Sequence, residues 1–339
     1  RYGKTLAISS PVMSLWLNPK LFEMGNVKRL AESLDISSKK LARRLERNKN
    51  QGFMYVKRHL PPEQAKKVLA LKLPGLFSET EYRRFYPASA VTSHVVGMTN
   101  IDGKGQEGLE LAYEEWLQGA PGQQRVVKDL LGNVIKQLNV SAIAKPGNEL
   151  KLTLDLRLQY LAYRELKAVV QTHKANWGSA VLLDARSGDI LALVNRPSYN
   201  PNNRSKLNAK AMRNRALTDM IEPGSTMKAF TVAASLKDGK YSANSMIDTS
   251  PGYMRIKQKT IRDHINYGDI NLTKIITKSS NIGVAKLAHD MGADKLWTML
   301  HSAKLGQATA LGFPGEAVGK LPYPQSLDQL GLATLSFGY

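Results

Sequence analysis

A serine and a lysine with the spacing of a nucleophile and its base lie in the central part of the 339-residue chain. Ser225 and Lys228 are three positions apart, so on a helix their side chains share one face, one turn apart. A serine hydroxyl is a poor nucleophile until a neighbouring group takes its proton, and lysine can take it when burial and nearby positive charge lower its pKa. The pair therefore predicts a serine nucleophile, Ser225, with Lys228 as its base.

The residues around this pair predict the helix that must position it. Pro223 and Gly224 interrupt the backbone, and apolar residues then recur at helical spacing until Gly239 ends the pattern. Unpaired N–H groups and the positive end of the dipole at a helix start favour an alkoxide or an acyl oxygen. We expect Ser225 at or beside a helix N-terminus, where the alternative is a plain N-cap serine.

The same four-residue pattern occurs a second time, at Ser37-Ser38-Lys39-Lys40. There we expect only a helix start, in which Asp35 and Ser37 cap a lysine- and arginine-rich amphipathic stretch. The pattern alone is therefore weak evidence for a nucleophile, and further motifs are needed.

A second polar pair, Ser279 and Asn281, opens another helical pattern that ends near Gly292. The Ser-x-Asn spacing also occurs at Ser198 and Ser242, but both lie in turn-rich stretches. Ser279 combines helical context with a position after Ser225. One turn would then supply a hydroxyl and an amide to the same site.

Together the two motifs resemble the penicillin-interacting serine acyltransferases, whose signature is Ser-x-x-Lys, Ser-x-Asn and Lys-Thr/Ser-Gly. Within this group the chain is most similar to the class B penicillin-binding proteins of the division-specific transpeptidase type. No Lys-Thr/Ser-Gly follows Asn281, and Arg186-Ser187-Gly188 lies between two strand-like runs, as a hairpin turn does. The wider resemblance rests on residues 3–7, 83–87, 105–110, 197–203 and 336–339.

The resemblance implies an α+β fold with two domains. Residues 1–150 would form a mixed, non-catalytic pedestal of the dimerisation type, and residues 151–339 a serine transpeptidase domain, an antiparallel sheet flanked by helices. The sequence agrees with a linker at 144–149, a strand at 150–154, a helix capped by Asp155 and a hairpin at 179–194. We expect the C-terminal part of the transpeptidase domain, with the third motif, to be missing after Tyr339, and Arg1 to follow further residues.

The resemblance also implies a reaction. Ser225 would attack the penultimate carbonyl of a peptidoglycan stem peptide ending in D-Ala-D-Ala, with Lys228 as base and the Ser225 N–H as half of an oxyanion hole. Ser279 would relay a proton to the departing D-Ala, and Asn281 would orient the substrate amide. An amine of a neighbouring strand would take the acyl group, β-lactams would acylate the same serine, and no cofactor is needed.

Partners and location are implied in the same way. We expect septal cell-wall synthesis beside a membrane-embedded glycan polymerase and other division proteins. The domains would lie in the periplasm, held to the bacterial inner membrane by a single N-terminal helix outside this chain. Two alternatives stay open: a β-lactam-hydrolysing or β-lactam-sensing relative, which a preceding pedestal argues against, and a non-catalytic scaffold of the division complex.

Composition limits other functions. The net charge is +20, and the basic residues from Lys39 to Lys49 crowd one stretch, which we interpret as a solvated face, with anionic lipid headgroups as the lesser alternative. Nucleic-acid binding is not expected, because aromatic residues make up only 7% and no reading element is recognisable. The glycines at 103, 105 and 108 fit a dinucleotide fingerprint but lie in a polar turn without a βαβ unit.

Other catalytic groups are also not expected. The six histidines are scattered and cysteine is absent, which leaves neither a metal-ligand pattern nor a Ser-His-Asp arrangement. We interpret Glu107 and Glu110 as helix-start acids or as partners in salt bridges between domains, rather than as catalytic carboxylates.

Overall fold

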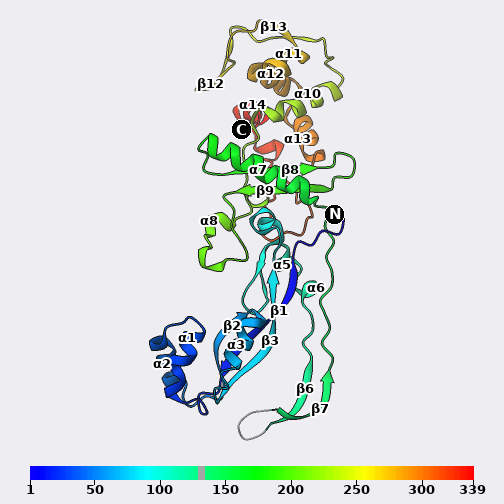
Figure 1. Cartoon of the computed structure of the whole chain (residues 1–339). Helices are drawn as coiled ribbons and strands as arrows, with labels where there is room; N and C mark the ends of the chain where they lie inside the picture. The colour runs from blue at the N-terminus through cyan, green and yellow to red at the C-terminus, as the bar shows by residue number, and fades with distance from the viewer. Residues whose placement is uncertain (129–133) are drawn as a thin grey trace. The chain divides into compact units, whose positions relative to one another are not determined.

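The computed structural model describes residues 1–128 and 134–339, and these fall into two compact units, Arg1–Ala216 and Leu217–Tyr339 (Figure 1). Each unit mixes helices with antiparallel strand pairs, which confirms the predicted α+β class. Among the helices of the described residues, none is both long enough and apolar enough to cross a bilayer.

The first unit is built on a three-stranded antiparallel sheet in the order β2-β1-β3. Pro11 lies inside the central strand, where a missing N–H would ordinarily break the ladder. It is tolerated because pairing with β2 begins only at Met13, so at Pro11 the strand has β3 as its single neighbour. The strands are β1 (Ile8–Leu17), β2 (Met54–Leu60) and β3 (Leu76–Phe85).

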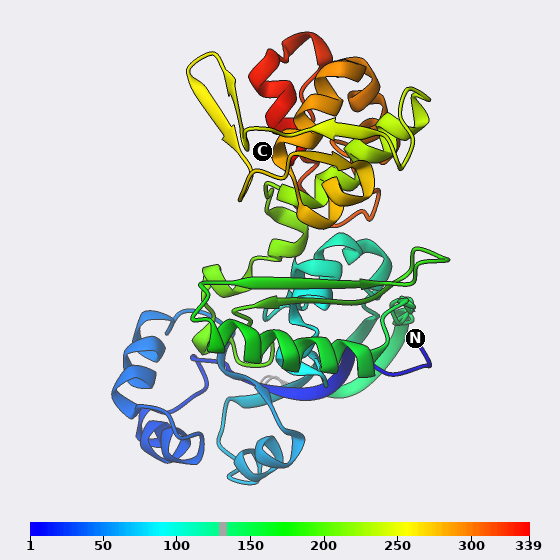
Figure 2. The ribbon, with the colours of Figure 1, turned by 90° about the horizontal axis from the view of Figure 1, so that it is seen from above.

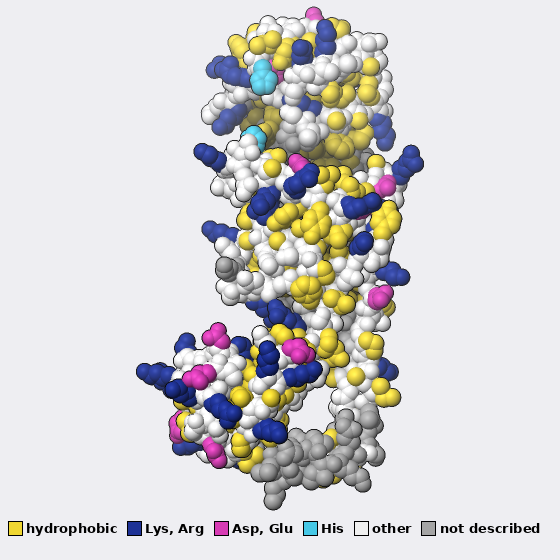
Figure 3. Space-filling model, viewed as in Figure 1, with side chains coloured by type: hydrophobic (Ala, Val, Ile, Leu, Met, Phe, Trp, Pro, Cys, Tyr) yellow, Lys and Arg dark blue, Asp and Glu magenta, His cyan; other side chains and the backbone are white. Residues whose placement is uncertain are grey.

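Three short helices cover this sheet and share its core, which contains Leu15, Leu30 and Leu41. They are α1 (Val27–Ser33), α2 (Ser38–Arg47) and α3 (Pro62–Leu69), which follow η1 (Met24–Asn26). Ser37 caps α2 as predicted, accepting a hydrogen bond from the Lys40 N–H, whereas the predicted capping role of Asp35 is wrong. Lysine and arginine side chains stand out on this part of the surface in Figure 3.

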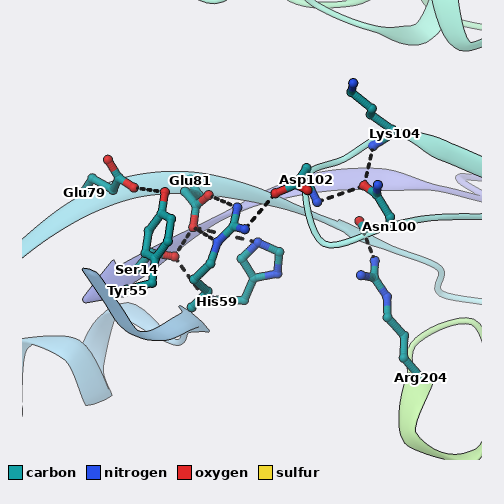
Figure 4. Close-up of polar contacts among 10 residues, drawn as sticks. Ser14, Tyr55, His59, Glu79, Glu81, Asn100, Asp102, Lys104 and Arg204 are labelled. Atoms are coloured by element: carbon teal, nitrogen blue, oxygen red, sulfur yellow. Dashed lines mark hydrogen bonds and ion pairs between the residues drawn. The ribbon is translucent and has the colours of Figure 1, made fainter. Parts of the chain in front are cut away.

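A cluster of polar side chains connects this sheet to the turn after β4 (Met98–Thr99) (Figure 4). Arg58 forms ion pairs with the carboxylates of Glu81 and Asp102, and its Nη1 atom lies 2.7 Å from Asp102 Oδ1. Ser14 also donates to Glu81. The Nε2 atom of His59 lies 4.0 Å from Glu81, and burial lowers the pKa of this imidazole. The cluster therefore joins three strands of the first unit through charge-assisted contacts.

The rest of the first unit consists of hairpins and short helices. Gly103 lies in the turn between β4 and β5, whereas Gly105 begins β5 and Gly108 begins α5, so the dinucleotide-like spacing is a hairpin connection followed by a helix. The elements are η2 (Ser89–Val91), α4 (Ser93–Val96), β4 (Met98–Thr99), β5 (Gly105–Glu107), α5 (Gly108–Ala112), α6 (Glu114–Leu117), β6 (Gln123–Lys128) and β7 (Val134–Ala142).

A long helix, α7 (Leu156–Thr172), lies along the hairpin of β8 (Gly178–Leu183) and β9 (Ile190–Arg196) (Figure 2). Asp155 caps α7 as predicted, accepting from the Arg157 N–H. The buried Gln159 side chain bonds both backbone groups of Leu193 on β9. The strand predicted at 150–154 is wrong: Thr153 Oγ1 donates to the Ile190 carbonyl oxygen on β9 at 2.8 Å, and the Leu152 and Leu154 carbonyl oxygens accept from the N-terminal ammonium group of Arg1. The first unit ends with η3 (Arg204–Lys206), α8 (Ala209–Met212) and the start of α9 (Arg215–Thr218).

The second unit is mainly helical around α12 (Asn281–Met291), whose Val284, Ala285 and Leu287 are fully buried. A helix that is apolar on most sides belongs in a core. The other helices of this unit are η4 (Gly224–Met227), α10 (Lys228–Lys237), α11 (Leu272–Lys278), α13 (Ala293–Ser302), η5 (Pro324–Ser326) and α14 (Gln329–Ser336). Its strands form two antiparallel pairs, β10 (Met246–Asp248) with β13 (Asp269–Asn271) and β11 (Tyr253–Ile256) with β12 (Lys259–Arg262).

Candidate active site

Ser225 lies where the sequence places it, in the single turn of η4 directly before α10. The Ser225 residue is exposed, whereas Lys228, the first residue of α10, is buried. Gly224 takes a φ of +62°, a backbone conformation that glycine adopts without strain. An exposed hydroxyl and a buried amine therefore leave the same short stretch of chain.

Ser279 bridges these two residues. Its hydroxyl accepts a hydrogen bond from Lys228 Nζ at 2.8 Å and donates to Ser225 Oγ at 3.1 Å. The Lys228 ammonium also donates to the Ser279 carbonyl oxygen. Ser279 has a φ of +55°, between the end of α11 and the start of α12, so the turn itself directs the hydroxyl. A continuous hydrogen-bonded series thus connects Lys228 through Ser279 to Ser225.

The electrostatics of Lys228 suit a base. Burial lowers the pKa of this ammonium group, while the Asp263 carboxylate acts in the opposite direction and raises it. From the sequence, a lowered pKa of Lys228 is expected to require both burial and nearby positive charge. The structure supplies the burial, but the charge that acts on the lysine is negative, so that part of the argument is wrong. Burial shifts Lys228 toward its neutral, proton-accepting form.

Asn281 lies two residues after Ser279, as the first residue of α12. Its side-chain amide donates to the Arg262 carbonyl oxygen at 3.0 Å, at the end of β12. The predicted residues therefore form one connected group of three, Ser225, Ser279 and Lys228, while the Asn281 side chain bonds to a neighbouring strand.

Asp263 belongs to this site, although the sequence argument missed it. Its carboxylate accepts from Ser280 Oγ at 2.6 Å and from the backbone N–H groups of Asn281 at 2.6 Å and Ile282 at 3.1 Å. A carboxylate at a helix start is stabilised by these unpaired N–H groups. Asp263 thus holds the turn that carries Ser279, a contact that no spacing along the chain signals.

Other residues considered from the sequence lie away from this group. Ser187 lies in the turn between β8 and β9, where its N–H bonds the Asp184 carboxylate, so the turn prediction is confirmed. Glu110 is buried and paired with Arg84 at 2.7 Å, a structural salt bridge within the first unit. Burial lowers the pKa of His94 to about 4. Within residues 1–128 and 134–339, no group of three potential metal-ligating side chains comes together.

Two protein-family models and several curated relatives match the chain. Residues 1–152 match the model of the penicillin-binding protein dimerisation domain, and residues 178–339 match that of the penicillin-binding protein transpeptidase domain. The whole chain is 42% identical to the peptidoglycan D,D-transpeptidase FtsI of Escherichia coli K12, covering 58% of that protein. It is 40% identical to the probable peptidoglycan D,D-transpeptidase PbpC of Pseudomonas aeruginosa, covering 60% of it.

Solved structures show a similar fold. A crystal structure of a peptidoglycan synthetase from Bifidobacterium adolescentis superposes with a TM-score of 0.72 at 24% identity. The match covers 99% of this chain and 66% of that one. The chain spans about three fifths of the length of the curated relatives it matches.

Proposed function

Because the chain belongs to the class B penicillin-binding proteins, with a dimerisation domain followed by a transpeptidase domain, we propose that it acts as a peptidoglycan D,D-transpeptidase. The substrate would be a stem peptide ending in D-Ala-D-Ala. The observation that carries this proposal is the hydrogen-bonded series from Ser225 through Ser279 to Lys228. This series offers what acyl transfer needs: a nucleophile, a proton path and a base of lowered pKa.

Acylation begins with Lys228 in its neutral form. As Ser225 Oγ bonds to the penultimate carbonyl carbon, its proton passes to Ser279 Oγ, and the Ser279 proton passes to Lys228 Nζ. When the tetrahedral intermediate collapses, the C–N bond to the terminal D-Ala breaks. The proton then returns from Lys228 through Ser279 to the departing nitrogen, which leaves an ester on Ser225.

In deacylation, protons move along the same series of Ser225, Ser279 and Lys228, and the attacking group is an acceptor amine. An amine of a neighbouring stem peptide attacks the ester carbonyl and gives its proton through Ser279 to Lys228. Ser225 leaves and takes the proton back, so the lysine is neutral again. A β-lactam acylates Ser225 in the same way, but its opened ring stays attached and blocks the amine. Asn281 would orient the substrate amide, and the Ser225 N–H would stabilise the oxyanion.

We further propose the setting of this reaction. Residues 1–150 serve as a non-catalytic pedestal and residues 151–339 belong to the transpeptidase domain, since the two family models match 1–152 and 178–339. The partners would be a membrane-embedded glycan polymerase and other division proteins. The domains would lie in the periplasm beside an inner membrane reached through an N-terminal helix. Septal synthesis is the role that the likeness to FtsI supports.

The test is release of D-Ala from a synthetic stem pentapeptide in the presence of an amine acceptor. We expect free D-Ala and a new peptide bond to the acceptor in equal amounts, both abolished in Ser225→Ala. Release of D-Ala without acceptor incorporation would support a hydrolytic relative, and no release with intact binding of division proteins would support a scaffold.

A further inference from the structure

After α14, the chain passes beside the turn that carries Ser225. The N–H of Gly224, the residue before Ser225, donates to the carbonyl oxygen of Gly338 at 3.0 Å. Gly338 lies in the stretch Ser336-Phe337-Gly338-Tyr339, which contributes to the family resemblance but takes no part in the chemistry described above. The backbone beside the nucleophile is thus paired with a segment more than a hundred residues away.

The two glycine backbones approach too closely for any side chain between them. A Cβ atom on Gly338 would lie 2.2 Å from the Gly224 oxygen and 2.5 Å from the Gly224 nitrogen. Contacts this short to backbone atoms force one segment to move. Gly338 also has a φ of +90°, which side chains disfavour. Two independent features therefore require glycine at this position.

The segment that carries Gly338 is itself anchored. Thr231 Oγ1, on α10, donates to the Ser336 carbonyl oxygen at 2.7 Å, and both residues are fully buried. Phe337 lies in the core of the second unit, and the Tyr339 N–H bonds the Thr334 carbonyl oxygen at 3.0 Å. These contacts hold Gly338 in place, so its carbonyl oxygen can fix the position of the Gly224 N–H.

Ser225 needs such a support more than its two partners do. Lys228 is buried at the start of α10, and Ser279 sits on the turn that Asp263 holds. Ser225 is exposed and belongs to a single helical turn. Its 3.1 Å contact with Ser279 therefore depends on the orientation of the Gly224–Ser225 peptide.

We propose that Gly338 is a positioning residue for the nucleophile: its backbone carbonyl and missing side chain hold Gly224 so that Ser225 Oγ faces Ser279. This inference rests on the proposed function, because it assigns Gly338 a part in acylation. It predicts that a side chain at 338 displaces Ser225 and slows bond formation while substrate binding persists. A displacement of about 1 Å in a reacting group costs on the order of a hundredfold in rate.

The experiment compares Gly338→Ala with a matched control, Gly239→Ala, in the intact protein. Gly239 follows α10, has a φ of +79° and would meet no atom within 4 Å of an added Cβ. Both variants place alanine in a strained backbone conformation, but only one pushes against Gly224. A rapid-mixing assay with a fluorescent penicillin separates non-covalent affinity from the acylation rate constant, and thermal unfolding reports stability.

We expect Gly338→Ala to lower the acylation rate constant by roughly 10- to 100-fold with affinity changed less than about twofold. Gly239→Ala should match the wild-type rate constant and lose less thermal stability than Gly338→Ala, because it adds backbone strain without a steric clash. Equal acylation rate constants for the two variants would overturn the proposal, whether both are unchanged or both are lowered, because an equal loss would reflect stability alone.

A second pair of variants covers the case in which Gly338→Ala does not fold. Thr231→Val removes the hydroxyl that anchors Ser336, and Thr231→Ser keeps it. We expect a slower acylation rate constant in the first and recovery in the second. Wild-type rates in Thr231→Val would contradict the anchoring. If Ser225→Ala is labelled as fast as the wild type, the proposed function fails, whereas a labelled wild type with indifferent Gly338 and Thr231 variants refutes only this inference.

Discussion

Substitution of Asp263 tests how the Ser279 turn is held. In Asp263→Ala, Ser280 Oγ and the N–H groups of Asn281 and Ile282 lose a charged acceptor. A hydrogen bond to a charged group contributes about 1.5–3 kcal/mol, and bonds to one carboxylate are not additive, so we expect a total loss of about 2–4 kcal/mol. The turn relaxes, and Ser279 no longer meets both Ser225 and Lys228.

The more informative variant is Asp263→Asn. Its side-chain oxygen can still accept from the two N–H groups, so the turn should persist, but the negative charge is gone. That charge raises the pKa of Lys228, against the larger lowering by burial. Without it the pKa of Lys228 falls further, so the lysine becomes neutral at lower pH. Because acylation needs neutral Lys228, the rising limb of its pH profile should move to lower pH.

The assay is the rate of acylation by a fluorescent penicillin across pH, with thermal unfolding recorded in parallel. Asp328→Asn is the matched control, because Asp328 caps α14 in the same unit, accepting from the Gly331 N–H at 2.8 Å. We expect Asp263→Ala to lose stability and about a hundredfold in rate, Asp263→Asn to shift the profile, and Asp328→Asn to do neither. An unmoved profile in Asp263→Asn, or a shift to higher pH, would refute the reasoning about Lys228.

Three further predictions follow from the same contacts. Lys228→Met should cut acylation by about 10²–10⁴-fold, the usual contribution of a general base, without lowering the melting temperature as far as Asp263→Ala does; a wild-type rate would remove Lys228 as base. Ser279→Ala should lower the acylation rate by on the order of a hundredfold or more, because it removes the hydroxyl between Ser225 and Lys228. Added small amines should not restore the rate, and quench-flow labelling measures both effects. Arg84→Met should cost about 3–5 kcal/mol in urea unfolding, because it leaves the buried Glu110 carboxylate unpaired, yet acylation of the folded protein should be unchanged.

The parts of the fold that the sequence predicts correctly are those set by local patterns. Ser37 and Asp155 cap the helices expected of them, and the β8–β9 hairpin forms around its turn. Residues 150–154 show where this fails: their alternation suits a strand, but no strand forms there, and Thr153 contacts β9 through its side-chain hydroxyl. Whether a strand pairs depends on its neighbours, which no local pattern contains.

The site divides in the same way. The spacing of Ser225 and Lys228, and the helical context of Ser279, make their grouping predictable, and their catalytic roles stay predictions. The roles of Asp263 and Gly338 cannot be predicted from the sequence, because each residue acts through a hydrogen bond to the backbone of a distant segment. The sign of the charge acting on Lys228 was also beyond reach, since it depends on where the chain brings Asp263.

The intact mass of the protein before and after incubation with a β-lactam tests the central claim most directly. We predict one drug adduct per molecule, located at Ser225 by peptide mapping, stable over minutes, and absent from Ser225→Ala. An adduct on another residue, an undiminished adduct in Ser225→Ala, or no adduct in a folded wild-type protein would contradict the assignment of Ser225 as the acylated nucleophile.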